Sequence, residues 1–335
     1  MDELISIIIP VYNLEVEIKR TLSSILGQTW QKVEIIAVDD GSADDSLAVM
    51  QDIASVDSRL RVFHQENSGV SGARLMGIRM AHGKWIGFVD GGDVIEPDMY
   101  ERLIKNAKLH HADISHCGYQ MVLRDRTDMY YGTGRKIVQD QLTGQRDLLE
   151  GQFVEPGLCN KLFRKELFQP LLKDNLMDLS IRNLEDLLMN YYLFREARQS
   201  VYEDFCPYHY IIQSGSATTG ALNEHKLKDP LKVLKIIEQE TTGEPLLQNA
   251  VQRRIVHFLI SLSTMDERDN PELVLPYRKQ AREELKERLP AIIKGDYRTR
   301  TKLMAASAAT VPGTYNKMHK IVSRVKGTDR KYETD

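Results

Sequence analysis

The sequence lacks long hydrophobic runs and paired cysteines, and both absences exclude classes of protein. Its longest apolar stretches, such as Ile7 to Val11 and Ile35 to Val38, are far shorter than the roughly 20 residues that span a membrane. Cys117, Cys159 and Cys206 show no C-x-x-C spacing, which argues against a disulfide framework and against a structural zinc site. We therefore expect reduced thiols in a core.

The sequence also lacks a large excess of either charge, because 45 basic and 48 acidic side chains leave a net charge of only −3. This balance conceals an acidic body and a basic C-terminal end. The acidic body, and the absence of aromatic residues among the basic ones, argue against nucleic-acid binding. The N-terminus has no basic start followed by a long apolar stretch, so no secretory signal is indicated and a cytoplasmic protein is expected.

The 335 residues, 42% hydrophobic and 28% charged, predict a globular chain of one or two domains. Short apolar runs predict strands of a parallel sheet at Ile5 to Ile9, Val33 to Val38, Arg61 to His64 and Trp85 to Val89. Amphipathic segments between them predict helices at 17–26, 46–54 and 72–81. This alternation is typical of a doubly wound α/β sheet.

Beyond the fourth predicted strand, the sequence patterns no longer alternate regularly between strand and helix. Patterns predict a helix at 97–107, a strand at 111–121, loops and edge β-structure at 122–157, and helices at 231–240, 246–265 and 271–289, where Pro271 suits a first helical turn. We therefore expect a sheet domain at 1–220 and a helical module with a basic tail at 221–335.

Polar residues follow the predicted strands, at the sheet edge where such folds bind ligands. The turn Pro10-Val11-Tyr12-Asn13 replaces the G-x-G-x-x-G of a dinucleotide site, so NAD and FAD are not expected. Asp39 and Asp40 end the second strand, where a carboxylate can accept hydrogen bonds from a ribose hydroxyl or a base N–H. The alternative is that these aspartates only form a turn and cap the next helix.

Asp90 and Asp93 flank two glycines after the fourth predicted strand. Magnesium or manganese often takes only one or two protein carboxylates beside phosphate oxygens, so this spacing suits a cation that bridges to phosphates. An ordinary turn is the alternative.

Together these segments resemble the inverting family 2 glycosyltransferases, which have the nucleotide-sugar-binding GT-A fold. The resemblance covers about residues 4–215 and rests on Ser6 to Asn13, Ser23 to Thr29, Val38 to Ser42, Asn67 to Arg74, Phe88 to Asp93, Asn160 to Arg164, Glu185 to Leu187 and Tyr208 to Tyr210. It implies a Rossmann-like, mostly parallel sheet flanked by helices, followed by a C-terminal helical module.

The resemblance also implies roles for individual residues. Pro10, Val11, Tyr12, Asn13 and Asp40 would hold the nucleoside, usually uridine, and Asp90 to Asp93 would be the metal-binding D-x-D region, with Mn²⁺ or Mg²⁺. Asp186 would be the catalytic base, since a positioned carboxylate can take the proton of an attacking hydroxyl. Asp39, Asn67 and Glu185 are further candidates for substrate binding.

Two alternatives stay open for these residues. Lys161, Arg164 and Arg74 are candidates for contacts with the leaving diphosphate, or they form surface or structural pairs instead. Asp186 and Glu185 would equally suit the first turn of a helix capped by Asn183.

The sequence departs from the family pattern at Gly92, where an acidic metal ligand is usual, and at Leu75, where asparagine is common. Either Asp90 and Asp93 hold the cation together with the diphosphate, which is our hypothesis, or basic residues replace it, or the chain is inactive.

We expect an inverting hexosyltransferase that uses a nucleotide sugar, UDP-linked, and a glycan or lipid-linked acceptor in cell-surface polysaccharide synthesis. The alternative is a silent relative that binds a ligand or a partner glycosyltransferase; a nucleotidyltransferase is disfavoured. Tyr315, Met318, Val322 and Val325 recur at helical spacing among basic residues. Such a helix would bind the inner face of the cell membrane or a partner protein, or pack on its own domain.

Overall fold

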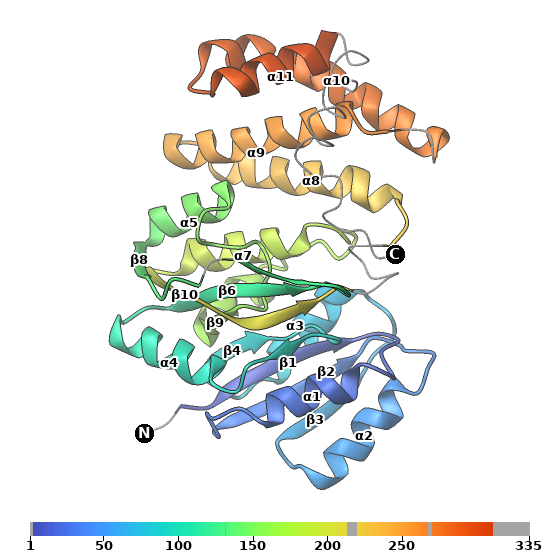
Figure 1. Cartoon of the computed structure of the whole chain (residues 1–335), viewed down its shortest axis with the longest axis vertical. Helices are drawn as coiled ribbons and strands as arrows, with labels where there is room; N and C mark the ends of the chain where they lie inside the picture. The colour runs from blue at the N-terminus through green and yellow to red at the C-terminus, as the bar shows by residue number, and fades with distance from the viewer. Residues whose placement is uncertain (1–2, 131, 213–219, 267–269, 311–335) are drawn as a thin grey trace. The chain divides into compact units, whose positions relative to one another are not determined.

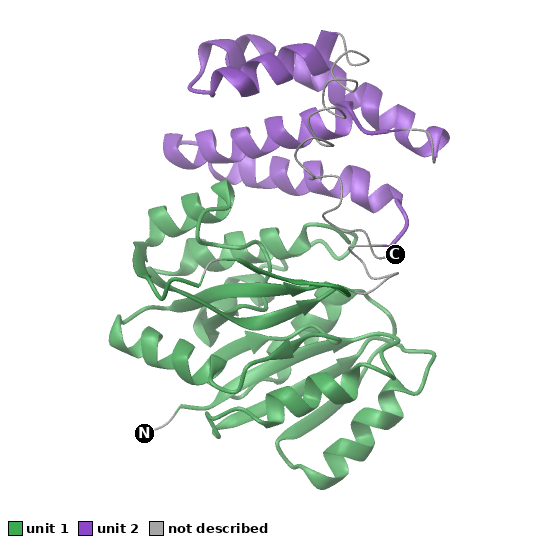
Figure 2. Ribbon diagram, in the orientation of Figure 1, with its two compact units in different colours: residues 1–213 green, residues 214–335 purple. Residues whose placement is uncertain are grey.

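The structure is a computed structural model that describes residues 3–130, 132–212, 220–266 and 270–310 (Figure 1). It divides into two units, Met1–Gln213 and Ser214–Asp335 (Figure 2). The predicted basic helix around Tyr315 to Val325 lies outside the described residues.

Four parallel strands form the first half of the sheet in unit 1, in the order β3-β2-β1-β4. They are β1 (Ile5–Val11), β2 (Val33–Asp39), β3 (Leu60–His64) and β4 (Trp85–Phe88). Every residue of β1 and β2 is buried, as expected for strands covered on both faces. The four strands predicted from the apolar runs are therefore confirmed.

Helices cover both faces of this half (Figure 1). Right-handed crossovers place α1 (Ile18–Leu26) and α2 (Ser46–Val56) on one face, because the chain moves outward from β1 to β3. It then returns from β3 to β4, which places α3 (Val70–Met80) on the other face. Helix α3 lies close to β1, since a Cβ on its Gly77 would be only 2.4 Å from the Ile8 Cγ2.

Antiparallel pairings enter in the second half, where the order continues β4-β9-β6-β10-β5. The strands are β5 (Val94–Ile95), β6 (Ile114–Val122), β9 (Lys161–Arg164) and β10 (Gln199–Ile211); β7 (Thr127–Tyr130) pairs with β6 and β8 (Lys136–Asp140) with β10. Strand β9 is antiparallel to both β4 and β6 and so joins the two halves. The result is a helix-flanked α/β sheet of the predicted class. Within the described residues, its four parallel and five antiparallel strand pairings make it more mixed than the mostly parallel sheet that was expected.

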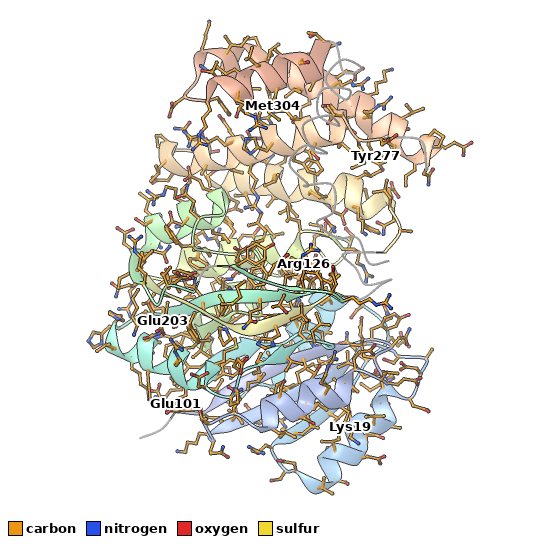
Figure 3. The ribbon with its side chains drawn as sticks, viewed as in Figure 1. Lys19, Glu101, Arg126, Glu203, Tyr277 and Met304 are labelled. Carbon is orange, nitrogen blue, oxygen red and sulfur yellow. The ribbon has the colours of Figure 1, made fainter. Side chains whose placement is uncertain are left out.

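Strand β10 links several elements of unit 1. It runs parallel to β6 with an irregularity between Glu203 and Tyr208, and its far end pairs with β5. Near the irregularity lies Glu203, which is labelled in Figure 3. It accepts hydrogen bonds from Arg102 Nη2 (2.7 Å) and Asn106 Nδ2 (2.5 Å) of α4 (Met99–Leu109), which fixes this helix on the sheet.

Helix α5 (Gln141–Glu150) was not predicted, because we expected only loops and edge strands over 122–157. Its residue Gly144 lowers helix propensity. In the structure this glycine is needed for packing, since a Cβ there would lie 2.9 Å from the Phe194 Cδ1. The signals for the helix are its ends: Asp140 accepts a hydrogen bond from Thr143 N (2.8 Å), and Gly151 adopts φ 68°.

A short 3₁₀ turn (Lys165–Phe168) and α6 (Gln169–Lys173) follow β9, and α7 (Glu185–Glu196) precedes β10. Leu184 is the residue before α7 and has φ 66°, in the left-handed region. The cap at Asn183, which the sequence left open as an alternative, is not formed, because Leu184 occupies the capping position and no side chain bonds there.

Unit 2 contains α8 (Glu224–Glu240), α9 (Pro245–Ser263), α10 (Pro271–Lys294) and α11 (Thr299–Thr310). Helix α8 begins earlier than predicted, with Asn223 accepting a hydrogen bond from Lys226 N (3.1 Å) and Pro230 inside the helix. Tyr277 of α10 donates to Glu224 of α8 at 2.6 Å (Figure 3). In the ranges that the structure describes, no helix combines the length and the apolar character needed to cross a bilayer.

Candidate active site

The polar residues predicted at the strand ends meet at one edge of the sheet in unit 1. The turn after β1, the end of β2 and the Asp90 turn after β4 lie there because parallel strands end on the same side. Helix α3 adds Arg74, and the start of α7 adds Glu185 and Asp186. This edge is the candidate active site.

Arg74 is the centre of the charged cluster. Its side chain is only 2% exposed, and Nη2 donates to Asp90 Oδ1 at 2.9 Å. Nη1 donates a short hydrogen bond to Asp186 and lies 3.6 Å from Glu185 Oε1. Although burial lowers the pKa of Arg74, the nearby Asp186 and Asp90 charges raise it well above the ordinary value, so the guanidinium remains charged.

The carboxyl groups outnumber this cation, and burial affects their protonation. Burial and the charge of Asp186 raise the pKa of Glu185 to about 7. The pKa of Asp186 is also raised, by burial and by Asp90, while Arg74 opposes the shift. The Asp186 side chain is still 26% exposed, so it is accessible to a ligand and is poised to take up a proton.

The D-G-G-D turn after β4 is held by α1. Gly92 N donates to Thr21 Oγ1 at 2.9 Å, and Gly92 O accepts from Arg20 Nη2 at 2.9 Å. Gly92 has φ 108°, a conformation that side-chain-bearing residues rarely adopt. Glycine at position 92 therefore permits this backbone conformation. It also leaves the turn without the acidic side chain that is usual at this position in the family pattern.

Asp93 points into the protein. Its Oδ2 accepts from the Tyr208 hydroxyl at 2.5 Å, and its Oδ1 accepts from Ile211 N at 2.9 Å. The same hydroxyl accepts from Asp90 N at 3.2 Å, so Tyr208 ties both ends of the turn to β10. Burial and the Asp90 charge raise the pKa of Asp93 to about 7.

These contacts do not fit the divalent cation that we expected at Asp90 and Asp93. Both carboxylate oxygens of Asp93 are used by β10, and Asp90 is paired with a guanidinium. Over the described residues, no cluster of three or more histidine, cysteine or acidic side chains is arranged to hold a metal. This arrangement therefore does not provide a metal site formed by Asp90 and Asp93.

Asp40 organises the loop between β3 and α3. Its Oδ1 accepts from Gln65 Nε2 (2.7 Å) and Ser68 N (2.9 Å), and its Oδ2 accepts from Gly69 N (2.8 Å). The residue is only 3% exposed, and these hydrogen bonds fix the loop between β3 and α3. Asp40 therefore has a structural role, but it holds a distant loop and does not form its own turn or cap the next helix, as the alternative reading expected.

The other predicted nucleoside residues differ in accessibility. Pro10 and Val11 are buried, and Asp39 is buried with its Oδ2 at 2.7 Å from His64 Nδ1. Asn13 is exposed with φ 53°, and its Oδ1 accepts from Ala43 N at 2.8 Å. Tyr12, which is 51% exposed, and Asn67, which is exposed in the loop that Asp40 holds, are accessible as well.

Lys161 has a structural role here. It is fully buried, and its Nζ donates to Glu155 O (2.8 Å), Gly157 O (2.5 Å) and Asn160 Oδ1 (2.7 Å). These three acceptors use all of its donors, and burial lowers the pKa of its ammonium to about 8. The lysine therefore ties the loop before β9 and has no donor left for a phosphate.

Arg164 is likewise a structural residue. Its Nε lies 3.0 Å from Asp113 Oδ1, and its guanidinium covers the Trp85 ring at 4.9 Å from the centroid. Structural pairing, the alternative left open by the sequence, describes this residue better than a diphosphate contact.

Two residues of the site were not predicted. Tyr208 was noted only as part of a matching segment, and its link to Asp93 depends on the pairing of β5 with β10. Arg182 lies in the segment before α7, and its Nη1 would be 2.0 Å from a Cβ built on Gly69. Nothing in the local sequence of Arg182 distinguishes it from an ordinary surface arginine.

Comparisons with known proteins show which family and which fold the chain resembles. Residues 6–172 match the family described as Glycosyl transferase family 2. The chain is 38% identical over 211 residues to the uncharacterized glycosyltransferase EpsJ of Bacillus subtilis (strain 168), covering 59% of this chain and 58% of that protein. It is 32% identical over 214 residues to the putative glycosyltransferase EpsH of the same organism, covering 63% and 62%. The match thus spans about three fifths of these relatives.

Solved structures share the fold. S. aureus TarS 1-349 in complex with UDP superposes with a TM-score of 0.68 at 19% identity, covering 97% of this chain and 92% of that one. The mannosyltransferase PcManGT from Pyrobaculum calidifontis, in complex with GDP-Man and Mn²⁺, gives 0.58 at 16% identity, covering 99% and 88%. At such identities the similarity concerns the fold alone, and it confirms the predicted GT-A class.

Proposed function

The chain belongs to glycosyl transferase family 2, and from this we propose that it is an inverting hexosyltransferase that uses a nucleotide sugar. The acceptor is a hydroxyl group of a glycan or lipid-linked glycan in cell-surface polysaccharide synthesis. The observation that carries the proposal is the placement of Asp186. This carboxylate is partly exposed, has a raised pKa and lies beside Asp90 at the ligand-binding edge of the sheet.

The proposed reaction is a single displacement. The acceptor oxygen attacks the anomeric carbon of the donor while Asp186 takes the proton from that oxygen. The bond between the anomeric carbon and the diphosphate oxygen breaks, and the nucleoside diphosphate leaves with the bonding electrons. Attack opposite to the leaving group inverts the anomeric configuration.

We propose a UDP-linked donor. Tyr12 and Asn67 are accessible beside the loop that Asp40 fixes, so the nucleoside end would lie there. The sugar end would lie toward Asp90, Glu185 and Asp186. The TarS complexes with UDP and UDP-GlcNAc show that the same fold accepts such a ligand.

The metal expected from the family pattern has no part in this proposed mechanism. Asp93 accepts two hydrogen bonds from β10, and Asp90 is paired with Arg74, so these residues do not fit a cation held by both aspartates.

A donor screen tests the proposal. The chain is incubated with UDP-, GDP-, TDP- and CMP-linked sugars, and release of nucleotide is measured with and without a glycan acceptor mixture. We expect turnover with one or more UDP-sugars. Turnover confined to another nucleotide would exclude the UDP assignment, and no nucleotide binding at all would exclude a transferase.

A silent relative is the second candidate, and it is favoured by Gly92 and by the ion pair between Arg74 and Asp186. It predicts UDP binding without hydrolysis or transfer of any donor. Single-turnover measurement with a labelled donor separates the two, because a slow enzyme still releases product in proportion to its concentration.

We also propose that unit 2 brings the enzyme to the cytoplasmic face of an anionic membrane. Ile293 and Leu303 are 52% and 67% exposed near the α10–α11 turn, and Lys294, Arg298 and Arg300 are exposed there. Apolar and basic residues together favour an anionic lipid surface. The protein should float with phosphatidylglycerol vesicles, and the double variant with Ile293→Ser and Leu303→Ser should no longer do so. Unchanged flotation would remove this part of the proposal.

A further inference from the structure

Acidic side chains outnumber basic ones at the proposed donor site. Asp90, Glu185 and Asp186 surround one buried guanidinium, that of Arg74. A nucleoside diphosphate adds further negative charge at this edge. Binding therefore requires positive charge beyond Arg74, whose two terminal nitrogens already face carboxylates.

A cation held by the D-G-G-D turn does not supply this charge. Three features make the turn unsuitable: Gly92 has no side chain and a φ of 108°, Asp93 is bonded to Tyr208 and Ile211, and Asp90 is bonded to Arg74. Gly92 is also held through both its N–H and its carbonyl by Thr21 and Arg20, so the turn is fixed in this form.

Arg182 provides a cation at a suitable place. Its exposed side chain reaches Gly69, whose N–H is bonded to Asp40, the residue that holds the nucleoside loop. Gly69 precedes α3, and Arg74 lies about 7.5 Å further along the helix axis at 1.5 Å per residue. The Arg182 side chain thus lies beside the loop that Asp40 holds, at the start of the helix that carries Arg74.

Arg182 also belongs to the same segment as the proposed base. It precedes Asp186 by four residues, in the segment that leads into α7. Glycine at position 69 suits this approach, because a Cβ there would be 2.0 Å from Nη1 of the arginine as it lies in the structure, and the residue has φ 83°.

We propose that this chain binds the diphosphate of its donor without a divalent cation, and that the guanidinium of Arg182 supplies the charge that a metal would otherwise supply. Arg74 keeps the Asp90 and Asp186 carboxylates in place, and Arg182 is a positioning residue for the diphosphate. The inference rests on the proposed nucleotide-sugar function.

Calorimetry with the full chain tests this proposal, using UDP as the probe in EDTA, in Mn²⁺ and in Mg²⁺, with GDP as a second nucleotide. We expect the Kd values for UDP in the three conditions to agree within about threefold. In binding free energy, this is less than half of the 1.4 kcal/mol that corresponds to a tenfold change in Kd. Arg182→Gln should weaken UDP binding about 10- to 100-fold, as for the loss of a charged hydrogen bond.

The matched control is Arg79→Gln, which removes an exposed arginine at the other end of α3. UMP provides a readout that a merely structural defect would not change. If Arg182 contacts the diphosphate, Arg182→Gln should reduce the preference for UDP over UMP, whereas Arg79→Gln should retain it. Equal thermal melting of the two variants shows that both are folded.

The outcomes are distinguishable. UDP binding that needs Mn²⁺ or Mg²⁺ overturns the metal-free proposal and leaves the nucleotide-sugar function standing. Equal UDP affinity and equal UDP preference in the Arg182 and Arg79 variants overturns the role of Arg182. No binding of UDP or GDP in any condition overturns the proposed function and this inference with it.

Discussion

Arg74 of α3 and Asp186 of α7 form an ion pair between residues 112 positions apart in the chain. The pair joins a helix of the parallel half of the sheet to the helix that precedes β10. It holds the proposed base in one orientation and lowers the pKa that burial would otherwise raise further. The following predictions concern this pair and the residues around it.

Replacing Asp186 should separate chemistry from binding. Asp186→Asn keeps the size of the side chain but cannot take a proton, so kcat should fall about 10²- to 10⁴-fold. The Kd for UDP should stay within about twofold, well below the tenfold, 1.4 kcal/mol step. Initial rates with the donor found in the screen give the first quantity and calorimetry the second. Glu185→Gln is the neighbouring control, and an equal loss of kcat in both variants would argue against a specific base at Asp186.

The pH dependence of transfer should report the raised pKa of Asp186. The base is active when ionised, so kcat should rise with pH through a pKa above the ordinary aspartate value. Arg74 lowers this pKa, and Arg74→Gln should therefore move the acidic limb to higher pH. Arg74→Lys keeps a positive charge and should move the limb less. A limb unchanged in Arg74→Gln, in a variant that still melts cooperatively, would show that another group controls the rate.

Lys161→Met should affect stability and leave nucleotide affinity alone. The substitution leaves the carbonyls of Glu155 and Gly157 without their buried donor, which should cost about 2–4 kcal/mol of unfolding free energy. The exposed Lys173→Met is the control. Urea unfolding and UDP calorimetry measure the two effects, and a large loss of UDP affinity in a stable Lys161→Met protein would restore the phosphate role.

Gly92→Asp should destabilise the protein without creating a metal requirement. An aspartate at φ 108° is strained by about 1–3 kcal/mol, and the turn is held at both its N–H and its carbonyl. We expect a lower Tm and the same UDP affinity in EDTA and in Mn²⁺. Gly151→Asp, at an exposed helix end with φ 68°, is a control for strain alone. New donor turnover that depends on Mn²⁺ would show instead that the turn can rearrange.

The sequence predicts the parallel half of unit 1 well because its strands are continuous apolar runs and its helices have clear faces. Helix α5 was not predicted because Gly144 lowers local propensity and is explained only by the position of Phe194. This contact comes from another part of the chain.

The residues that form the site were easier to predict than the contacts that each of them makes. The resemblance drew attention to Asp90, Asp93 and Asp186, and all three lie at the predicted edge. Which partner each carboxylate takes depends on strand register, since Tyr208 reaches Asp93 only because it pairs opposite Ile95. Lys161 and Arg164 could not be distinguished from phosphate-binding residues without the positions of Gly157 and Asp113.

The long-range links of Asp93 determine how the chain can be shortened. The match to the family ends at residue 172, before α7 and before β10, whereas Tyr208 and Ile211 are the residues that satisfy the Asp93 carboxylate. A fragment cut at the end of that match would contain an unpaired buried carboxyl and a guanidinium without Asp186. The shortest autonomous catalytic fragment must therefore extend through Ile211. The Asp93 carboxylate is satisfied only when β10 is in place, and such distant pairings favour slow assembly.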